Sequence, residues 1–351
     1  MTGKPSEIIF RRLQRVGKAT YAISLPKRWV VDRGLKPGDA LEISEELDGS
    51  LCIKPLETRP RLFPCRINAE LCRSSEQLAR LITACYRAGY DSIEISFTGM
   101  ATPEALKSVK KTVTEALPGF DIIEETGSKL IIQNILDHSK YQLDDLLRRI
   151  HLITSTIFSN LMDFVTTRRY ELIPYIADLR KRALEILQLH SRLLISYFKR
   201  QETGRFLKPR SGAHIYSAIL VAHIFRGVID DLTLFAEEVS KMRKRIWANP
   251  EIYRVLSYSL ESASKLFDDT LTAYFSINFE RATHVLSVSE DVFSTVIEDA
   301  IHEKTIKDPA LNRFLTRSVI FLRDLTRKCR EIAQLTLDMF VELENPILQR
   351  T

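Results

Sequence analysis

The sequence predicts a multidomain protein with a small β head, a small α/β middle domain and an all-α body. Nine of the twelve glycines lie before residue 128 of the 351-residue chain, which predicts a turn-rich first third. The remainder carries apolar residues at spacings of three and four, as long amphipathic helices do. Residues 1–38 hold nine basic and two acidic residues, so their net charge of +7 exceeds the +6 of the whole chain. With 45% hydrophobic residues, the chain is too apolar to be disordered.

The head, residues 1–58, is predicted to hold a short helix at 27–33 and four strands, at 8–15, 21–25, 40–44 and 51–54. Pro26 suits the first helical position, where a missing N–H costs nothing, and Gly34 ends the helix. Asp48-Gly49 is a strong hairpin turn. About 50 residues bury little core and short strands leave open edges, so we expect the head to form a homodimer or a higher oligomer.

The middle domain, residues 61–137, is predicted to have the order β-α-β-α-β-β. Ser74 or Ser75 caps the first helix, and Thr102-Pro103-Glu104 begins the second. Strands are expected at 64–69, 93–97, 120–125 and 129–135. The segment has no phosphate-binding glycine motif and no metal-spaced acid and histidine pair, so we expect a spacer or a sensor module.

Residues 139–351 are predicted to be helical throughout, as two three-helix bundles at about 140–246 and 250–345. Breaks rich in glycine, proline and polar residues divide the region into six helices, at 140–167, 171–202, 212–246, 250–276, 279–304 and 309–345.

The cysteine pattern and the apolar runs indicate a cytoplasmic protein that is not inserted in a membrane. The five cysteines are odd in number and form no CxxC pair, which favours reduced thiols over disulfides or a zinc site. The most apolar run, residues 215–229, is interrupted by His223 and Arg226 and is too short to span a bilayer.

The basic residues of the head are candidate contacts to double-stranded DNA. A twisted β ribbon that carries arginine can enter a DNA groove, and a guanidinium group can bind phosphate or guanine through two hydrogen bonds. The alternative is an ordinary solvated charged face. The candidates are Arg11, Arg12, Arg15, Lys18, Lys27 and Arg28.

Residues 11–55 resemble the SpoVT/AbrB swapped-hairpin DNA-binding family. The resemblance rests on Gly17, the phrase Leu25-Pro26-Lys27-x-Trp29, the phrase Gly34-Leu35-x-x-Gly38-Asp39 and the hairpin Asp48-Gly49-Ser50-Leu51. It implies that two chains interlace their hairpins in one barrel. It also implies that the basic first hairpin and the start of the short helix face DNA.

Residues 140–345 resemble the PhoU family of paired three-helix bundles that regulate phosphate uptake. The third helices of the two halves carry the phrases Leu234-Phe235-Ala236-Glu237 and Glu331-Ile332-Ala333-Gln334. Together with the head, this resemblance implies an archaeal-type phosphate uptake regulator and partners among phosphate transporter components.

Members of the PhoU family can bind metal through acids four residues apart on a helix. At the matching positions this sequence has arginine instead, at Arg226, Arg323 and Arg327. The remaining candidates are Asp230 with Asp231, and Asp268 with Asp269. Salt bridges are the favoured alternative for these acids, so no resident metal or other cofactor is expected.

The sequence and the two resemblances therefore predict a DNA-binding transcriptional regulator of phosphate uptake or transport genes, whose helical body senses a ligand or partner. No HExxH, HxH or GxSxG motif is present, so no catalytic activity is expected. Two alternatives stay open. One is a PhoU-type interaction protein that acts on a phosphate transporter, with DNA binding secondary. The other is a metal-dependent enzyme, against which the missing acids argue.

Overall fold

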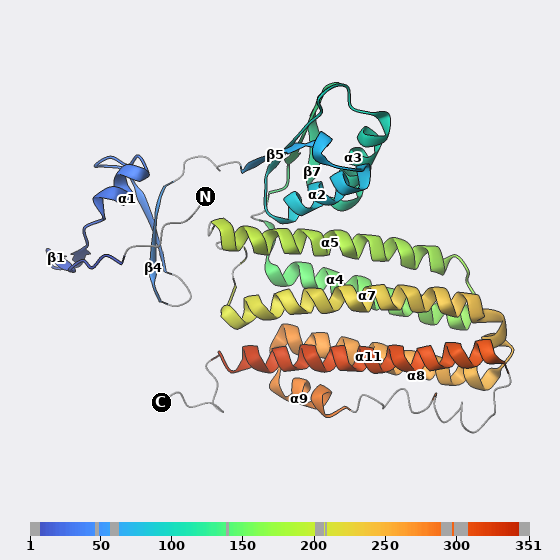
Figure 1. Cartoon of the computed structure of the whole chain (residues 1–351). Helices are drawn as coiled ribbons and strands as arrows, with labels where there is room; N and C mark the ends of the chain where they lie inside the picture. Colours follow the sequence, from blue (N-terminus) through green and yellow to red (C-terminus); the bar gives the residue numbers. More distant parts are fainter. Residues whose placement is uncertain are drawn as a thin grey trace. The chain divides into compact units, whose positions relative to one another are not determined.

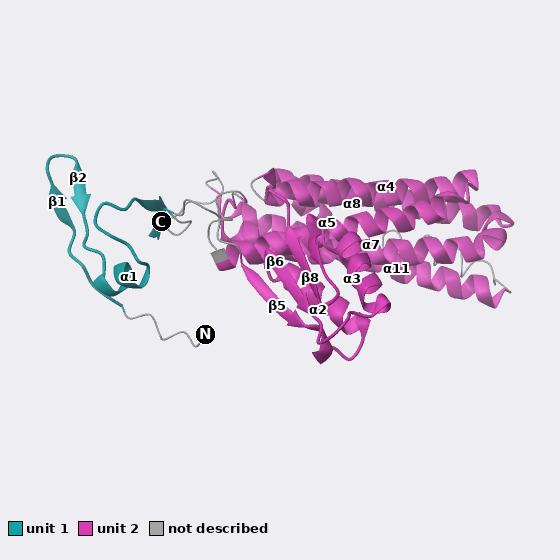
Figure 2. Ribbon diagram, turned by 90° about the horizontal axis from the view of Figure 1, so that it is seen from above, with its two compact units in different colours: residues 1–61 teal, residues 62–351 magenta. Residues whose placement is uncertain are grey.

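A computed structural model of the chain describes residues 8–45, 49–56, 63–137, 140–200, 207, 209–288, 297 and 308–343. Contacts between residues divide the chain into two compact units, 1–61 and 62–351 (Figure 2). No helix in these described stretches has the length and hydropathy needed to cross a bilayer.

The first unit, which we call the head, consists of two antiparallel hairpins and one short helix. β1 (Gln14–Val16) pairs with β2 (Thr20–Ala22), and β3 (Leu41–Glu45) pairs with β4 (Leu51–Pro55). Helix α1 (Lys27–Asp32) lies between the two hairpins in sequence. Gly17, in the turn between β1 and β2, has a φ of +72°, a backbone conformation that glycine adopts without steric cost.

The first hairpin is shorter than the sequence predicts. The strand expected at 8–15 begins only at Gln14, whose register partner Ala22 is the last residue of β2. Residues 8–13 therefore have no strand opposite them within their own chain, and they form no regular structure.

The second unit begins with a four-stranded sheet covered by two helices on one face. The strands are β5 (Pro64–Asn68), β6 (Ser92–Ser96), β7 (Phe120–Glu125) and β8 (Lys129–Asn134), in the spatial order β5-β6-β8-β7. β5 and β6 are parallel and the other pairs antiparallel. A short 3₁₀ turn, η1 (Ala69–Leu71), follows β5.

Helices α2 (Ser75–Arg87) and α3 (Pro103–Ala116) begin at side-chain caps. The hydroxyls of Ser74 and Thr102 accept hydrogen bonds from the N–H groups of Gln77 and Ala105. The apolar face of α2 and alternate residues of the strands form one core, to which α3 also contributes; its members include Leu78, Ile82, Tyr86, Ile93, Ile95, Val109 and Ile132. We call this part the α/β layer.

Six long or medium helices follow and lie side by side (Figure 1). They are α4 (Leu143–Thr167), α5 (Leu172–Arg200), α7 (Gly212–Trp247), α8 (Pro250–Ser276), α9 (Phe279–Ser287) and α11 (Pro309–Phe340). Pro250 and Pro309 occupy first-turn positions after the capping side chains of Asn249 and Asp308. Most buried apolar residues of the six helices belong to one continuous core that runs through both predicted bundles. Leu146 of α4 and Leu189 and Leu193 of α5 form a separate, smaller cluster.

The predicted helix over 279–304 is wrong in its length, because α9 ends at Ser287 and Val288 is extended. Arg330 of α11 explains the end. Its Nη1 donates hydrogen bonds to the carbonyls of Leu286 (2.8 Å) and Val288 (2.7 Å), which a continuing helix would pair with its own N–H groups. Of the remaining predicted residues, all but Ile297 lie outside the described part of the chain. Helix α11 ends at Phe340, before the predicted residue 345.

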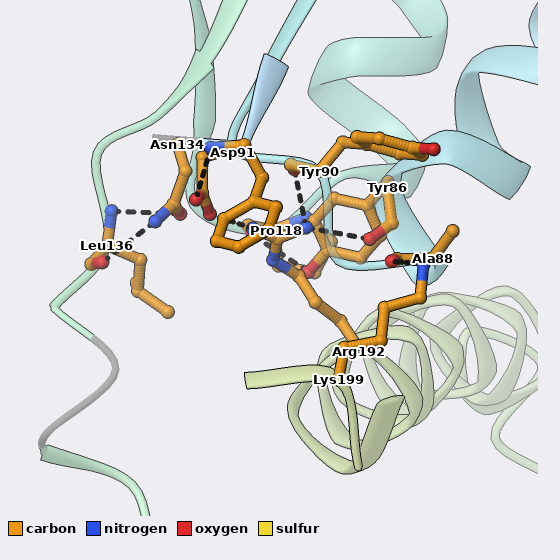
Figure 3. A network of polar contacts seen from close by, with 10 residues as sticks. Tyr86, Ala88, Tyr90, Asp91, Pro118, Asn134, Leu136, Arg192 and Lys199 are labelled. Carbon is orange, nitrogen blue, oxygen red and sulfur yellow. Dashed lines mark hydrogen bonds and ion pairs between the residues drawn. The ribbon is translucent and has the colours of Figure 1, made fainter. Parts of the chain in front are cut away.

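A buried arginine joins the α/β layer to α5. Arg192 has no exposed surface, and its Nη1 donates to the carbonyls of Tyr86 and Tyr90, both at 2.7 Å (Figure 3). Its Nη2 lies 2.8 Å from Oδ1 of Asp91. The guanidinium carbon is 5.0 Å and 4.8 Å from the ring centroids of Tyr86 and Phe120. We call this set of contacts the Arg192 clasp; it fixes the end of α2 on α5.

Candidate nucleic-acid interface

The structure places all six DNA-contact candidates on the surface of the head. Arg11 and Arg12 precede β1, Arg15 is on β1, and Lys18 is in the β1–β2 turn. Lys27 and Arg28 open helix α1. Each of the six side chains is exposed. The structure therefore brings four of them together on and beside one hairpin and two at the start of one helix.

The basic side chains of the head form few hydrogen bonds or ion pairs within it. The Arg15 Nη2 donates to the Lys18 carbonyl at 3.0 Å, which holds the turn while leaving the other guanidinium N–H groups available. Arg11 Nη1 donates to the carbonyl of its neighbour Phe10 at 3.1 Å. Arg28 forms an ion pair with Asp32 at 3.6 Å, with both side chains more than 60% exposed. A pair this exposed contributes little and yields easily to a phosphate.

One face of the first hairpin carries an arginine beside an aromatic ring. The register sets Arg15 directly opposite Tyr21, and opposite residues of an antiparallel pair project from the same face. Tyr21 is 63% exposed. A guanidinium group and a phenol hydroxyl at this position provide hydrogen-bond donors suited to phosphate oxygens. The charge count alone did not identify Tyr21; its signal was its place opposite Arg15 across the Gly17 turn.

A single copy of the head has no core. None of its side chains in residues 8–45 and 49–56 is buried. Isolated two-stranded hairpins are marginally stable in water, and the head holds two of them. Eleven of its large apolar side chains are exposed instead: Ile8, Ile9, Phe10, Leu13, Val16, Tyr21, Ile23, Val31, Ile43, Leu51 and Leu56. Surface of this kind is typical of a protein–protein interface.

The candidate metal ligands of the helical body are paired with other side chains. Asp230 Oδ1 lies 2.7 Å from Arg180 Nη2, and Asp231 Oδ2 lies 2.5 Å from Lys328 Nζ. Partial burial opposes the charge of Lys328, but its hydrogen bonds to Asp231 and Asp324 raise its pKa above the ordinary value. These carboxylates therefore have cationic partners in the structure.

Asp268 is likewise held by neighbours on another helix. Its Oδ1 lies 2.8 Å from His151 Nε2 and accepts a hydrogen bond from the Ser155 hydroxyl at 2.6 Å. Burial acts to raise the pKa of Asp268, but these hydrogen bonds outweigh it and keep the pKa below the ordinary value. Asp269, beside it, is half-buried. Within the residues that the structure describes, no three His, Cys, Asp or Glu side chains are grouped as a metal site would require.

Two of the arginines that stand where the resemblance expects acids have different surroundings. Arg327 pairs with Asp324 and Arg226 lines a cavity between the α/β layer and the helices. Sequence reasoning missed the Arg192 clasp. Its signal was a charged residue among the four leucines of residues 187–194 in α5, a position where burial with a partner is the expected outcome.

Comparison with protein families supports the assignment of the head. Residues 14–61 match the family described as antidote-toxin recognition MazE, bacterial antitoxin. The head is thus a MazE/AbrB-like domain, of the swapped-hairpin type. The match begins at the first residue of β1 and includes Arg15, Lys18, Lys27 and Arg28, but not Arg11 or Arg12. It covers less than half of the chain. Comparison with curated proteins and with solved structures found no match.

Proposed function

We propose that this protein is a DNA-binding regulator whose heads pair in a dimer and contact double-stranded DNA. The proposal rests on three features of the head. Exposed arginine and lysine side chains lie on and just before one hairpin, no described side chain is buried in a single copy, and the sequence matches a DNA-binding type of domain. A second copy would bury the exposed apolar residues and place two basic hairpins on one assembly.

The contacts that we assign are Arg11 and Arg12 just before the first hairpin, Arg15 and Lys18 on it, and Lys27 and Arg28 at the start of α1. Phosphate contacts by these side chains would release condensed counterions, so affinity should fall steeply with salt. Two-fold symmetry of the dimer implies a DNA site with two related halves.

We further propose that the helical body receives a signal connected with phosphate supply and passes it to the head. This part rests on the length, order and number of the helices and on the resemblance of their sequence to PhoU proteins. Genome-wide DNA occupancy measured with and without phosphate tests it. Occupancy that changes at phosphate-transport genes supports the role, and occupancy that is the same under both conditions contradicts it.

Fluorescence anisotropy with the full chain and labelled duplex DNA of mixed sequence tests the DNA-binding proposal. The variant replaces Arg11, Arg12 and Arg15 with alanine. The matched control replaces Arg182, Arg254 and Arg313, three exposed arginines of the helical body, and so removes the same charge.

In a dimer the head variant removes six cations, which should flatten the slope of log K against log salt by up to about 5. The body variant should keep the slope of the original protein. A head variant that binds DNA with the same slope as the body variant would refute the assignment of these residues.

A further inference from the structure

Two cysteines of the α/β layer meet at the open edge of its sheet. Cys65 lies on β5, the edge strand, and Cys85 lies in the last full turn of α2. In the sheet register Cys65 is beside the buried Ile93, so its side chain is on the face that α2 covers. The two thiol groups are close enough for each to shift the pKa of the other.

The pair is accessible from solvent. Both cysteines are only partly buried, and both line a cavity of about 690 Å³ between β5, η1 and α2. Cys72 lines the same cavity, as do the basic residues Arg66 and Arg80. Each of these arginines has an acidic partner, Glu94 and Glu76 respectively.

The groups around the two cysteines favour the thiolate form of Cys85. The hydrogen bond from Cys65 and the nearby charge of Lys199 lower the pKa of Cys85 to about 7, against the effect of burial, while the same hydrogen bond and burial raise the pKa of Cys65. Lys199 Nζ donates to the carbonyl of Ala88 at 2.7 Å. A cation at this place offsets the negative end of the α2 dipole, which by itself disfavours a thiolate.

From this geometry we infer that Cys65 and Cys85 form an oxidation site, at which hydrogen peroxide converts the two thiols into an intramolecular disulfide. The Cys85 thiolate attacks one oxygen of the peroxide, the O–O bond breaks, and hydroxide leaves as a sulfenic acid forms. The Cys65 sulfur then attacks the sulfenic sulfur, the S–O bond breaks, and hydroxide leaves as the S–S bond forms. The two protons that the thiols lose convert both hydroxides into water, so two thiols and one hydrogen peroxide give one disulfide and two waters.

The disulfide would act next to the Arg192 clasp. Cys85 directly precedes Tyr86, whose carbonyl holds Arg192, and the Cys85 carbonyl accepts a hydrogen bond from the N–H of Tyr90 at 3.3 Å. A covalent bond from Cys85 to β5 therefore fixes the same turn that joins the α/β layer to α5.

Peptide mapping of the reduced full chain after treatment with hydrogen peroxide, without reductant, tests the inference. The expected product is a peptide pair linked through Cys65 and Cys85, lighter than the two thiol peptides by two hydrogen atoms. The Cys65→Ser and Cys85→Ser variants should each lose this product. The Cys72→Ser variant, altered in the same cavity, should retain it.

A second measurement on the untreated protein does not depend on any variant. At pH 7 Cys85 should react with iodoacetamide roughly tenfold faster than Cys72, because its lowered pKa makes a large fraction of Cys85 thiolate. Cys329, which is fully buried with its pKa raised by burial to about 12, should not react. The inference is overturned if Cys85 reacts no faster than Cys72, if peroxide links Cys72 instead, or if Cys65 and Cys85 are oxidised separately to sulfinic acids.

Discussion

Replacement of Arg192 by methionine is expected to loosen the α/β layer from helix α5. Methionine keeps most of the length of the side chain but removes its charge and its hydrogen-bond donors. Asp91, 6% exposed, would keep the hydrogen bond from the Phe63 N–H at 3.2 Å but lose the guanidinium group at 2.8 Å. The carbonyls of Tyr86 and Tyr90 would lose the same donor.

The expected loss in free energy of unfolding follows from the burial of the ion pair between Arg192 and Asp91. Removing one partner of a fully buried ion pair costs roughly 3–5 kcal/mol, because the other charge is left without compensation. Lys199→Met is the matched control on the same helix. Lys199 is exposed and makes one hydrogen bond to the same turn, so its loss should cost about 1 kcal/mol or less. The double variant Arg192→Met with Asp91→Asn should recover at least about 1 kcal/mol relative to Arg192→Met alone, since no unpaired charge is then buried.

Hydrogen exchange at increasing urea concentrations, measured on peptides that contain β6 and β8, gives the free energy of opening of the α/β layer. These two strands form the middle of the sheet, and their exchange reports opening of the α/β layer. Two results would refute this prediction. One is that Arg192→Met lowers the free energy of unfolding no more than Lys199→Met does. The other is that Asp91→Asn destabilises the Arg192→Met protein as much as it destabilises the original protein.

Four other substitutions test three further predictions, with Gly127→Ala as the control for Gly119→Ala. His190 is buried without a hydrogen-bond partner on either ring nitrogen, and burial lowers its pKa from 6.5 to about 4. As the pH falls below 6.5, the imidazole takes up a proton in the unfolded chain but not in the folded one. The free energy of unfolding should therefore fall by ~2 kcal/mol between pH 7 and pH 5 because of this group. Urea titrations at the two pH values should show that His190→Leu removes this loss. Gly119 has a φ of +79°, and a Cβ there would lie 2.6 Å from that of Leu136, so Gly119→Ala should cost ~2 kcal/mol in thermal unfolding. A Cβ at Gly127 meets Met100 only at 3.6 Å, and Gly127→Ala should cost less than ~0.5 kcal/mol. Ile43→Glu, at a residue 62% exposed in the single chain, should weaken dimerisation at least about tenfold in sedimentation experiments; an unchanged dimer would remove Ile43 from the interface.

Local signals in the sequence predicted much of the fold because they act within a few residues. Ser74 and Thr102 do cap α2 and α3, and Pro250 and Pro309 do open α8 and α11. The end of α9 could not be found in this way. Arg330, which binds the carbonyls there, lies 42 and 44 residues further along the chain, and nothing near Ser287 announces it.

The same distinction applies to the site. The glycine and proline phrases of the head located the basic hairpin, because these residues fix its turns. The partners of Arg192, by contrast, precede it by about a hundred residues, and only the packing of α5 on the α/β layer brings them together. Cys65 and Cys85 were predicted only to be reduced thiols, since their contact depends on how α2 crosses the edge strand.

Native mass spectrometry of the full chain with a duplex DNA tests the central claim most directly, since it reports dimerisation and DNA binding together. We expect a complex of two chains, twice the 40.4 kDa of one, on a single duplex. This complex should be lost when Arg11, Arg12 and Arg15 are replaced by alanine. One chain per duplex, or a two-chain complex that survives those replacements at the same concentration and salt, would contradict this claim.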